Sequence, residues 1–158
     1  MLVRRVQPGD ADGLQRFLKG LSPRSVYLRF CSGGANLNAA VHRFTEVTGE
    51  RVGVVACDLQ REIVAHAEYL LIPSGRAEVA VVVADQLQGR GLARKMIDWL
   101  ATDAARQGIE SFVASVLPEN APMLALFTRA FDATVTESPM MCEVSFPIPQ
   151  AMAERRAA

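Results

Sequence analysis

One candidate ligand site lies where an apolar segment runs into two closely spaced glycines. Residues 77–84 are almost all apolar, and Gly89 and Gly91 follow them directly before a segment with helical periodicity. Glycine lets a backbone approach a ligand closely, and the first amides of a helix have no acceptor within the helix. A strand, a glycine turn and a helix start, in this order, form a geometry that binds phosphate.

The residue types at this helix start also favour a bound anion. Residues 88–91 read Gln-Gly-Arg-Gly and include no Ser, Thr, Asp or Asn that could cap the helix. Arg90, Arg94 and Lys95 place positive charge at the end of the helix where it is unfavourable. A phosphate would cap the free amides and pair with these cations. The alternative is a glycine turn before an ordinary amphipathic helix whose arginines point to water.

Two familiar phosphate-binding patterns do not fit this segment. A P-loop needs Gly, four residues and then Gly-Lys-Ser/Thr, which is absent. The dinucleotide fingerprint needs a small residue where Arg94 stands and an acidic residue at the end of the next strand, whereas Glu110 precedes that strand. A nucleotide-binding module stays open as an alternative, and it predicts that ATP or NAD competes for the loop.

The loop resembles the acetyl-CoA pyrophosphate loop of the GCN5-related N-acetyltransferase (GNAT) superfamily. That loop has the form Gln/Arg-x-x-Gly-x-Gly/Ala, which residues 88–93 match, and residues 86–91 match it in a second register. The resemblance implies that the pantetheine of acetyl-CoA lies along a splayed central strand, beside the backbone of Val81 and Val83. It also implies that six residues hold the pyrophosphate: Gln88, Gly89, Arg90, Gly91, Leu92 and Ala93.

A second segment resembles the same superfamily. Asn120 precedes a predicted helix on which Met123 and Phe127 recur at helical spacing. In the superfamily this asparagine and helix face flank the pantetheine arm. The resemblance therefore implies acetyl-CoA as co-substrate, an amine acceptor as the other partner, and no metal.

Glu78 is the candidate catalytic base. Transfer to an amine needs a neutral nitrogen, and a lysine-like amine is protonated near neutral pH, so a base must remove a proton. Glu78 lies within the apolar strand, where we expect burial to raise its pKa. The alternative is a strand-end glutamate that reaches solvent beside Arg76. Glu68 and His66, two residues apart on the preceding strand, are the reserve candidates.

The usual general acid of the superfamily is missing. Its tyrosine on the helix after the asparagine corresponds to Phe127, which cannot donate a proton. The sequence therefore names no general acid, and a CoA-binding sensor or partner protein that has lost turnover stays open as an alternative.

One subgroup of the superfamily is closer. Residues 22–30 resemble the start of the acetyltransferase domain in bacterial Pat-type protein lysine acetyltransferases. Those enzymes also carry a glutamate at the position of Glu78 and an Asn-x-Pro-Met step, which residues 120–123 match. The resemblance implies a protein lysine as the favoured acceptor, with a glutamate base and no required tyrosine acid. A small-molecule amine is the alternative acceptor.

Composition narrows the function classes. The chain has 158 residues, of which 50% are apolar, and 17 basic residues balance 17 acidic ones. The balance argues against a primary role on nucleic acid or an anionic membrane, and the longest apolar run, 79–84, is too short to cross a bilayer. Cys31, Cys57 and Cys142 are far apart, so we expect them to fill core in a reducing cytoplasm. A sheet edge near 140–146 allows a monomer or a homodimer.

The element order predicts one mixed α+β domain over 1–146 and a polar, mobile tail over 147–158. Three strands linked by hairpins exclude a purely alternating β-α-β layout. We expect a central, mostly antiparallel mixed sheet of six to seven strands, flanked by helices. The predicted strands are 2–6, 52–58, 63–72, 77–84, 109–116, 133–136 and 141–146, and the predicted helices are 10–19, one beginning at 22–23, 37–47, 89–107 and 118–130.

Overall fold

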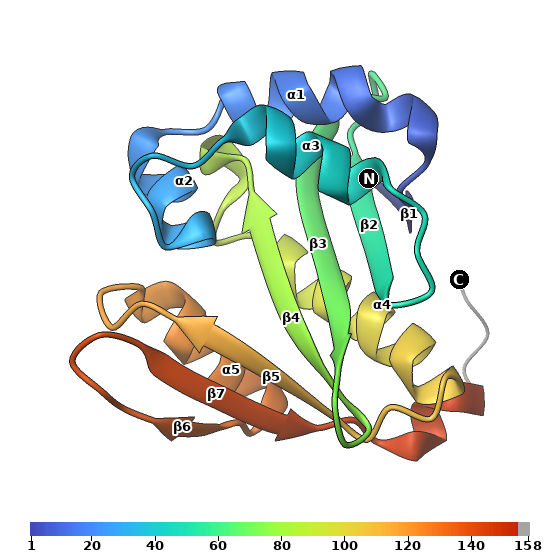
Figure 1. Ribbon diagram of the computed structural model, residues 1–158, viewed down its shortest axis with the longest axis vertical. Helices are drawn as coiled ribbons and strands as arrows, with labels where there is room; N and C mark the ends of the chain where they lie inside the picture. The colour runs from blue at the N-terminus through green and yellow to red at the C-terminus, as the bar shows by residue number, and fades with distance from the viewer. Residues whose placement is uncertain (155–158) are drawn as a thin grey trace.

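The computed structural model describes residues 1–154, whose strands form one seven-stranded sheet (Figure 1). The spatial order is β1-β2-β3-β4-β5-β7-β6, and only the β4–β5 pair is parallel. The mixed, mostly antiparallel fold expected from the sequence is confirmed. The strands are β1 (Leu2–Arg5), β2 (Arg51–Cys57), β3 (Ile63–Ile72), β4 (Arg76–Val83), β5 (Ser111–Val116), β6 (Thr134–Thr136) and β7 (Cys142–Pro147).

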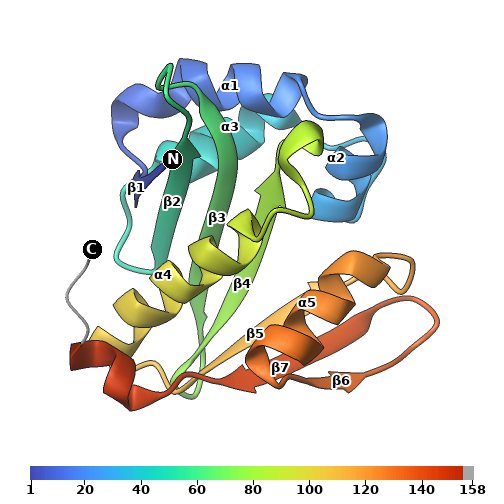
Figure 2. The ribbon, with the colours of Figure 1, turned by 180° about the vertical axis from the view of Figure 1, so that it is seen from behind.

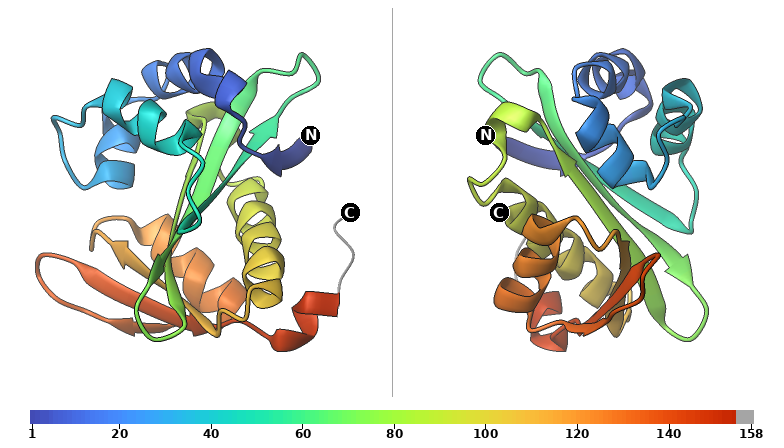
Figure 3. Two further views of the ribbon diagram at one scale, coloured as in Figure 1. Left: turned by 45° about the vertical axis from the view of Figure 1, so that its right-hand side comes forward. Right: turned by 90° about the vertical axis from the view of Figure 1, so that its left-hand side faces the viewer.

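Helices lie on both faces of the sheet, as the edge-on view in Figure 3 shows. Helices α1–α3 lie on one side, and α4 and α5 lie on the other. Each begins within three residues of its predicted start, and α2 begins directly after Ser22, whose hydroxyl caps it by accepting a hydrogen bond from the Ser25 N–H. The helices are α1 (Ala11–Lys19), α2 (Pro23–Phe30), α3 (Leu37–Thr45), α4 (Leu92–Arg106) and α5 (Ala121–Phe131), with short 3-10 turns η1 (Pro8–Asp10), η2 (Asp85–Leu87) and η3 (Gln150–Glu154).

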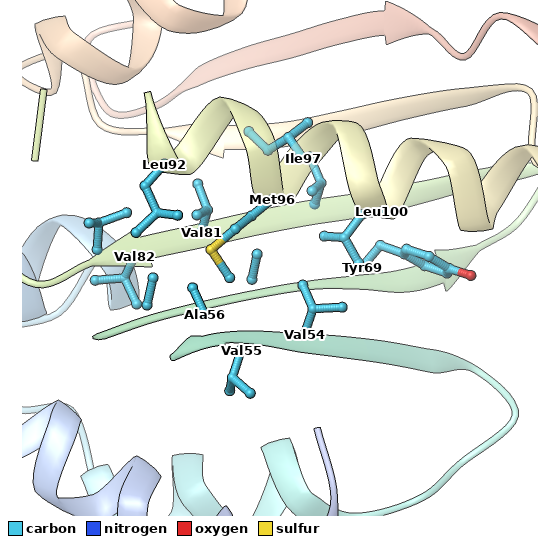
Figure 4. Close-up of a cluster of buried hydrophobic side chains, with 14 of the residues drawn as sticks. Val54, Val55, Ala56, Tyr69, Val81, Val82, Leu92, Met96, Ile97 and Leu100 are labelled. Atoms are coloured by element: carbon cyan, nitrogen blue, oxygen red, sulfur yellow. The ribbon is translucent and has the colours of Figure 1, made fainter. Parts of the chain in front are cut away.

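Helix α4 closes one side of the core. Its residues Met96, Ile97 and Leu100 are fully buried and lie over the middle of β2, β3 and β4 (Figure 4). This helix is fixed by a stripe of apolar residues at helical spacing, so the start of α4 is held in place beside the end of β4.

Helix α5 covers the remaining strands from the same side (Figure 2). Phe127 of α5 packs against Phe146 of β7, with ring centroids 5.4 Å apart, and Phe112 of β5 completes the cluster. On the opposite face, exposed residues of these strands include Ser115 and Glu143, and no helix within residues 1–154 covers this face (Figure 1). The sheet is therefore open to solvent on one side of β5, β7 and β6.

A cluster of charged residues is buried between the sheet and helices α2 and α3. Glu68 of β3 accepts hydrogen bonds from Arg29 of α2 and Arg51 of β2, each at 2.7 Å. Burial opposes the charged form of Glu68, but the positive charges around it, including both arginines, lower its pKa below the usual value. The ion pair between Arg29 and Glu68 holds α2 against the centre of the sheet.

His66 lies beside this cluster and is fully buried. Its ring stacks on Phe44 of α3 with centroids 3.9 Å apart, and neither ring nitrogen has a hydrogen-bond partner among the described residues. Burial, together with the charges of Arg29 and Arg51, lowers the pKa of His66 to about 3, although Glu68 opposes this shift. His66 is therefore uncharged in the folded protein at neutral pH.

The predicted tail needs correction. Residues 147–154 are folded against the domain: Ile148 is buried in the core, and Met152 and Ala153 pack against it. The Gln150 side chain also donates to the carbonyl of Ile109 at 3.1 Å. The prolines and polar residues around Ile148 made the segment look polar in the sequence, although Ile148 itself is apolar. Residues 155–158 of the predicted tail lie outside the described part of the chain.

Cysteine placement agrees with the sequence only in part. Cys57 and Cys142 are buried, as expected, but Cys31 is exposed, in a left-handed conformation at the end of α2. Within residues 1–154, no group of three or more His, Cys, Asp or Glu side chains is arranged to hold a metal ion. None of the described helices is both long and apolar enough to span a membrane.

The burial of His66 predicts a loss of stability in mild acid. The unfolded chain binds a proton on this side chain below about pH 6.5, whereas the folded chain excludes it down to about pH 3. Stability therefore falls as the pH falls through this window, by about 2 kcal/mol between pH 6.5 and 5. Denaturant unfolding at pH 7.5, 6.5, 5.5 and 5 measures this slope.

Two variants assign the slope to its source. His66→Leu is expected to remove most of it and to keep stability at pH 7.5, because the buried nitrogens have no partner to lose. His42→Gln, on the exposed face of α3, is expected to leave the slope as in the wild type. A His66→Leu protein with the wild-type slope would show that other groups cause it.

Candidate acyl-transfer site

The central strand β4 is paired along its whole length on one side and over only three residues on the other. Its ladder with β3 runs from Arg76 to Val83. Its ladder with β5 joins only Arg76–Glu78 to Ser111–Val113. Beyond these residues β4 and β5 diverge into a V, which is visible from both sides in Figures 1 and 2.

The divergence leaves backbone groups of β4 facing the gap. The Ala84 N–H donates to the Val64 carbonyl of β3 at 2.9 Å, so by the alternation of a strand Val79, Val81 and Val83 turn their N–H and C=O groups toward β5. The Val83 carbonyl accepts a hydrogen bond from the Gln88 side chain at 3.1 Å. The ladder with β5 ends before Val81, so at this residue the two groups face the gap.

A cavity of about 440 Å³ lies at the open end of the V. It is bounded by α2, the end of β4, the glycine loop and the start of α5. Nine of the residues that the sequence assigned to the cofactor line it, namely Val81, Val83, Gln88, Gly89, Gly91, Leu92, Ala93, Asn120 and Met123. Arg90 is exposed and does not line it.

The glycine loop directs the start of α4 at this cavity. Gly89 and Gly91 have φ values of 71° and 78°, which residues with a side chain rarely adopt. Gly91 is the N-cap of α4 and contributes no side-chain cap. The first amides of α4 therefore point into the cavity, where Arg94 is also on the wall.

A hydrogen-bond network ties this loop to α2. The Asp85 carboxylate accepts from the Ser22 hydroxyl at 2.6 Å, the Ser25 hydroxyl at 2.7 Å and the Ser22 N–H at 3.0 Å. These hydrogen bonds lower the pKa of Asp85. Gln88 in turn donates to the Ser25 hydroxyl at 3.1 Å. Sequence reasoning missed this network, because only the cap role of Ser22 has a local signal.

The second predicted segment forms the far wall. The Asn120 side chain accepts the Met123 N–H at 3.4 Å and caps α5. Phe127, one turn further along, is 2% exposed and belongs to the aromatic cluster under the gap. Helix α2 also reaches this wall, because the Tyr27 hydroxyl donates to Glu119 at 3.2 Å.

A smaller cavity of about 40 Å³ lies deeper in the V. Phe127, Ser115 and Arg29 are on its wall, together with residues that also line the larger cavity, such as Val81. The two cavities are therefore contiguous. Their shared walls connect the glycine loop to the point where β4 and β5 separate.

Glu78 lies at that point of separation, but it is not buried as we expected. Its side chain is exposed and accepts a hydrogen bond from the Ser115 hydroxyl at 3.3 Å. The residue faces the side of the sheet that no helix covers near β5, which the sequence pattern does not reveal. Of the reserve candidates for the base, the Glu68 carboxylate accepts hydrogen bonds from two arginines, and His66 is fully buried.

Comparisons with known proteins agree with this architecture. The model of the acetyltransferase (GNAT) family matches residues 24–132, more than half of the chain. The GNAT domain of PAT from S. lividans is 32% identical and superposes with a TM-score of 0.83, over 92% of this chain and 89% of that one. The PaiA N-acetyltransferase of Thermoplasma acidophilum, solved in complex with coenzyme A, shares the fold at 8% identity, with a TM-score of 0.70 over 92% and 98% of the two chains.

A curated relative is longer than this chain. Acetyltransferase Pat of Mycolicibacterium smegmatis is 30% identical in an alignment of 154 residues that covers 92% of this chain and 45% of the relative. The chain thus spans a little under half of the length of that relative.

The conformation of Gly91 makes a test of the loop possible. Open space surrounds the position of a Cβ at Gly91, so Gly91→Ala meets only the cost of its positive φ. We expect the free energy of unfolding to fall by about 1 kcal/mol. Gly33→Ala is the control, because it also meets no neighbour and has no positive φ. Equal effects of the two substitutions in denaturant unfolding would contradict the strained geometry of the loop.

Proposed function

Since the chain belongs to the acetyltransferase (GNAT) family, we propose that it transfers an acetyl group from acetyl-CoA to a primary amine, with a protein lysine as favoured acceptor. The observation that carries the proposal is the gap beside Val81, which continues into the large cavity and ends at the uncapped start of α4. A long, narrow substrate with a phosphate-bearing end fits this shape.

The groups along the cavity support acetyl-CoA as its ligand. The free backbone of Val81 can pair with the amides of a pantetheine arm as a neighbouring strand would. The amides of Leu92 and Ala93 can bind the pyrophosphate, whose negative charge is also favourable beside Arg94 on the cavity wall. Asn120 and Met123 close the opposite side of the arm.

Glu78 is our proposed base. It lies at the junction of β4 and β5, beside the small cavity, and opens to solvent on the uncovered face of the sheet. An amine can therefore approach from solvent and lose its proton to Glu78, directly or through water. The amine nitrogen then bonds to the carbonyl carbon, the carbon–sulfur bond breaks and CoA leaves as its thiolate.

Both tyrosine hydroxyls already donate to carboxylates, that of Tyr27 to Glu119 at 3.2 Å. Tyr69 is buried under α4, where its hydroxyl donates to Asp103 at 2.8 Å, and burial raises its pKa. Phe127 stands where the superfamily has its tyrosine. Water is the proton source for the leaving thiolate in this proposal. Phe127 also favours one competing function, that of a CoA-binding protein without turnover.

The preference for a protein lysine rests on the Pat relatives, whose GNAT domains are 30% and 32% identical to this chain. The uncovered face beside Glu78 is accessible to a side chain carried on another protein. A small amine is the alternative acceptor. Mass spectrometry after incubation with acetyl-CoA separates the two, because it detects the added acetyl group on lysines of proteins or on free amines.

Ligand binding is the first test. In calorimetric titrations we expect saturable binding of acetyl-CoA and no competition by NAD or ATP, since the loop lacks both nucleotide patterns. Competition by either nucleotide would favour the nucleotide-binding alternative. Absence of acetyl-CoA binding would overturn the proposed function as a whole.

The role of Glu78 is tested separately. Glu78→Gln is expected to lower kcat about 100-fold or more, with the Kd for acetyl-CoA unchanged because the residue lies outside the large cavity. Glu143→Gln is the matched control, an exposed glutamate on the same face whose register partner is Ser115. Equal losses in both variants would assign the effect to the charge of this face. A protein that binds acetyl-CoA and acetylates no amine would be the silent CoA-binding alternative.

A further inference from the structure

Arg29 is a buried cation that uses only part of its hydrogen-bonding capacity. Its side chain is 9% exposed, and its guanidinium is flanked by the rings of Phe30 and Phe44, at 5.1 and 5.5 Å. Nη2 donates to Glu68 at 2.7 Å, whereas the buried Nε has no partner among the described residues. A guanidinium carries five N–H donors, so donors remain for another acceptor.

Arg29 also lines the small cavity in the V, opposite Val79–Val81 of β4 and Ser115 of β5. The cavity measures about 40 Å³, which is little more than the share of one water molecule in the liquid, about 30 Å³. Any group that enters it therefore lies close to every wall, the Arg29 wall included. The carbonyl oxygen of an acetyl group, which is about the size of one water molecule, is small enough to enter it.

The buried charges behind this cavity do not balance. Arg29 and Arg51 share the single carboxylate of Glu68, and His66 beside them is uncharged, as described above. Within this cluster one positive charge is left over, because Glu78, the carboxylate at the junction of β4 and β5, is exposed to water and is not part of it. Such a buried cluster attracts negative charge more strongly than the same charges would in water.

We propose that Arg29 donates an N–H to the carbonyl oxygen of the thioester and stabilises the negative charge that develops there. This inference rests on the proposed function. As the amine nitrogen bonds to the carbonyl carbon, the electron pair of the C=O bond moves to oxygen, beside Arg29. It returns to the C–O bond when the carbon–sulfur bond breaks. Arg29 gains and loses no proton, so its role is electrostatic.

A purely structural role for Arg29 makes a different prediction, which Arg51 can test. Both arginines bond to Glu68 at 2.7 Å, but Arg51 does not line the small cavity. If Arg29 served only to neutralise Glu68 and hold α2, Arg29→Met and Arg51→Met would have similar effects on turnover. If Arg29 acts on the carbonyl, only Arg29→Met removes the stabilisation of the carbonyl oxygen and lowers turnover.

The kinetic test compares these variants under saturating acetyl-CoA. For Arg29→Met we expect kcat to fall about 100-fold or more, the loss typical for one oxyanion donor, while the Kd for CoA changes less than about threefold. For Arg51→Met we expect kcat within about fivefold of the wild type. Equal losses in two folded variants would overturn the proposal.

The spectroscopic test is independent of the acceptor. With acetyl-CoA labelled by ¹³C at the carbonyl, difference infrared spectra report the C=O stretch of the bound thioester. A donor at the oxygen lowers this frequency, so we expect a downshift in the wild type and in Arg51→Met that is absent in Arg29→Met. A downshift retained in Arg29→Met would overturn the inference even where CoA binds normally.

Two further outcomes distinguish a failure of the inference about Arg29 from a folding defect and from a failure of the proposed function. If Arg29→Met does not fold, Arg29→Lys replaces it, since lysine keeps the charge but has fewer donors. We then expect a kcat between those of the wild type and a null enzyme, with a smaller downshift, and wild-type values in Arg29→Lys would overturn the proposal. If no variant and no wild-type protein binds CoA, the proposed function fails first, and the inference about Arg29 falls with it.

Discussion

The parallel ladder between β4 and β5 ends after three residues, and the candidate site depends on this limit. A longer ladder would satisfy the backbone of Val81 within the sheet and would close the gap. Two helices on the same face keep the strands apart: α4 packs on β2–β4, and α5 packs on β5 and β7. The two lobes, β2–β4 with α4 and β5–β7 with α5, therefore each have their own buried apolar contacts. The space between the two lobes is free for a ligand.

Helix α2 joins the two ends of this space. At its start, Ser22 and Ser25 bond to Asp85 beside the glycine loop. At its end, Arg29 bonds to Glu68 in the centre of the sheet. Few buried apolar residues hold this short helix, so polar contacts determine its position. The wall of the site is thus held by hydrogen bonds, whose strength depends on distance and angle.

Sequence reasoning found the features that local rules govern. The strand, the two glycines and the uncapped helix start are close in the chain, and each has its own signal in residue type or spacing. The cap Ser22, which stands directly before Pro23, was readable for the same reason. By contrast, the pairing of Asp85 with Ser22 joins residues far apart in sequence, and no local rule predicts it.

The exposure of Glu78 depends on a feature that its own strand pattern does not contain. Alternation along a strand shows that a side chain faces one side of a sheet, but not whether a helix covers that side. Arg29 had no local signal either, because its partner Glu68 lies 39 residues away in the sequence. The family resemblance supplied the site residues, and the fold shows which of them line the cavity.

The last turns of the described chain return to the closed end of the V. The Ile148 N–H donates to the Glu110 carbonyl at 2.8 Å, and the Glu110 N–H donates to the Gly75 carbonyl at 2.9 Å, just before β4. The hinge at which the two lobes meet is thus held from the C-terminal side. A tag, fusion or truncation at residue 146 would remove these hydrogen bonds. An expressed domain should therefore extend beyond residue 146.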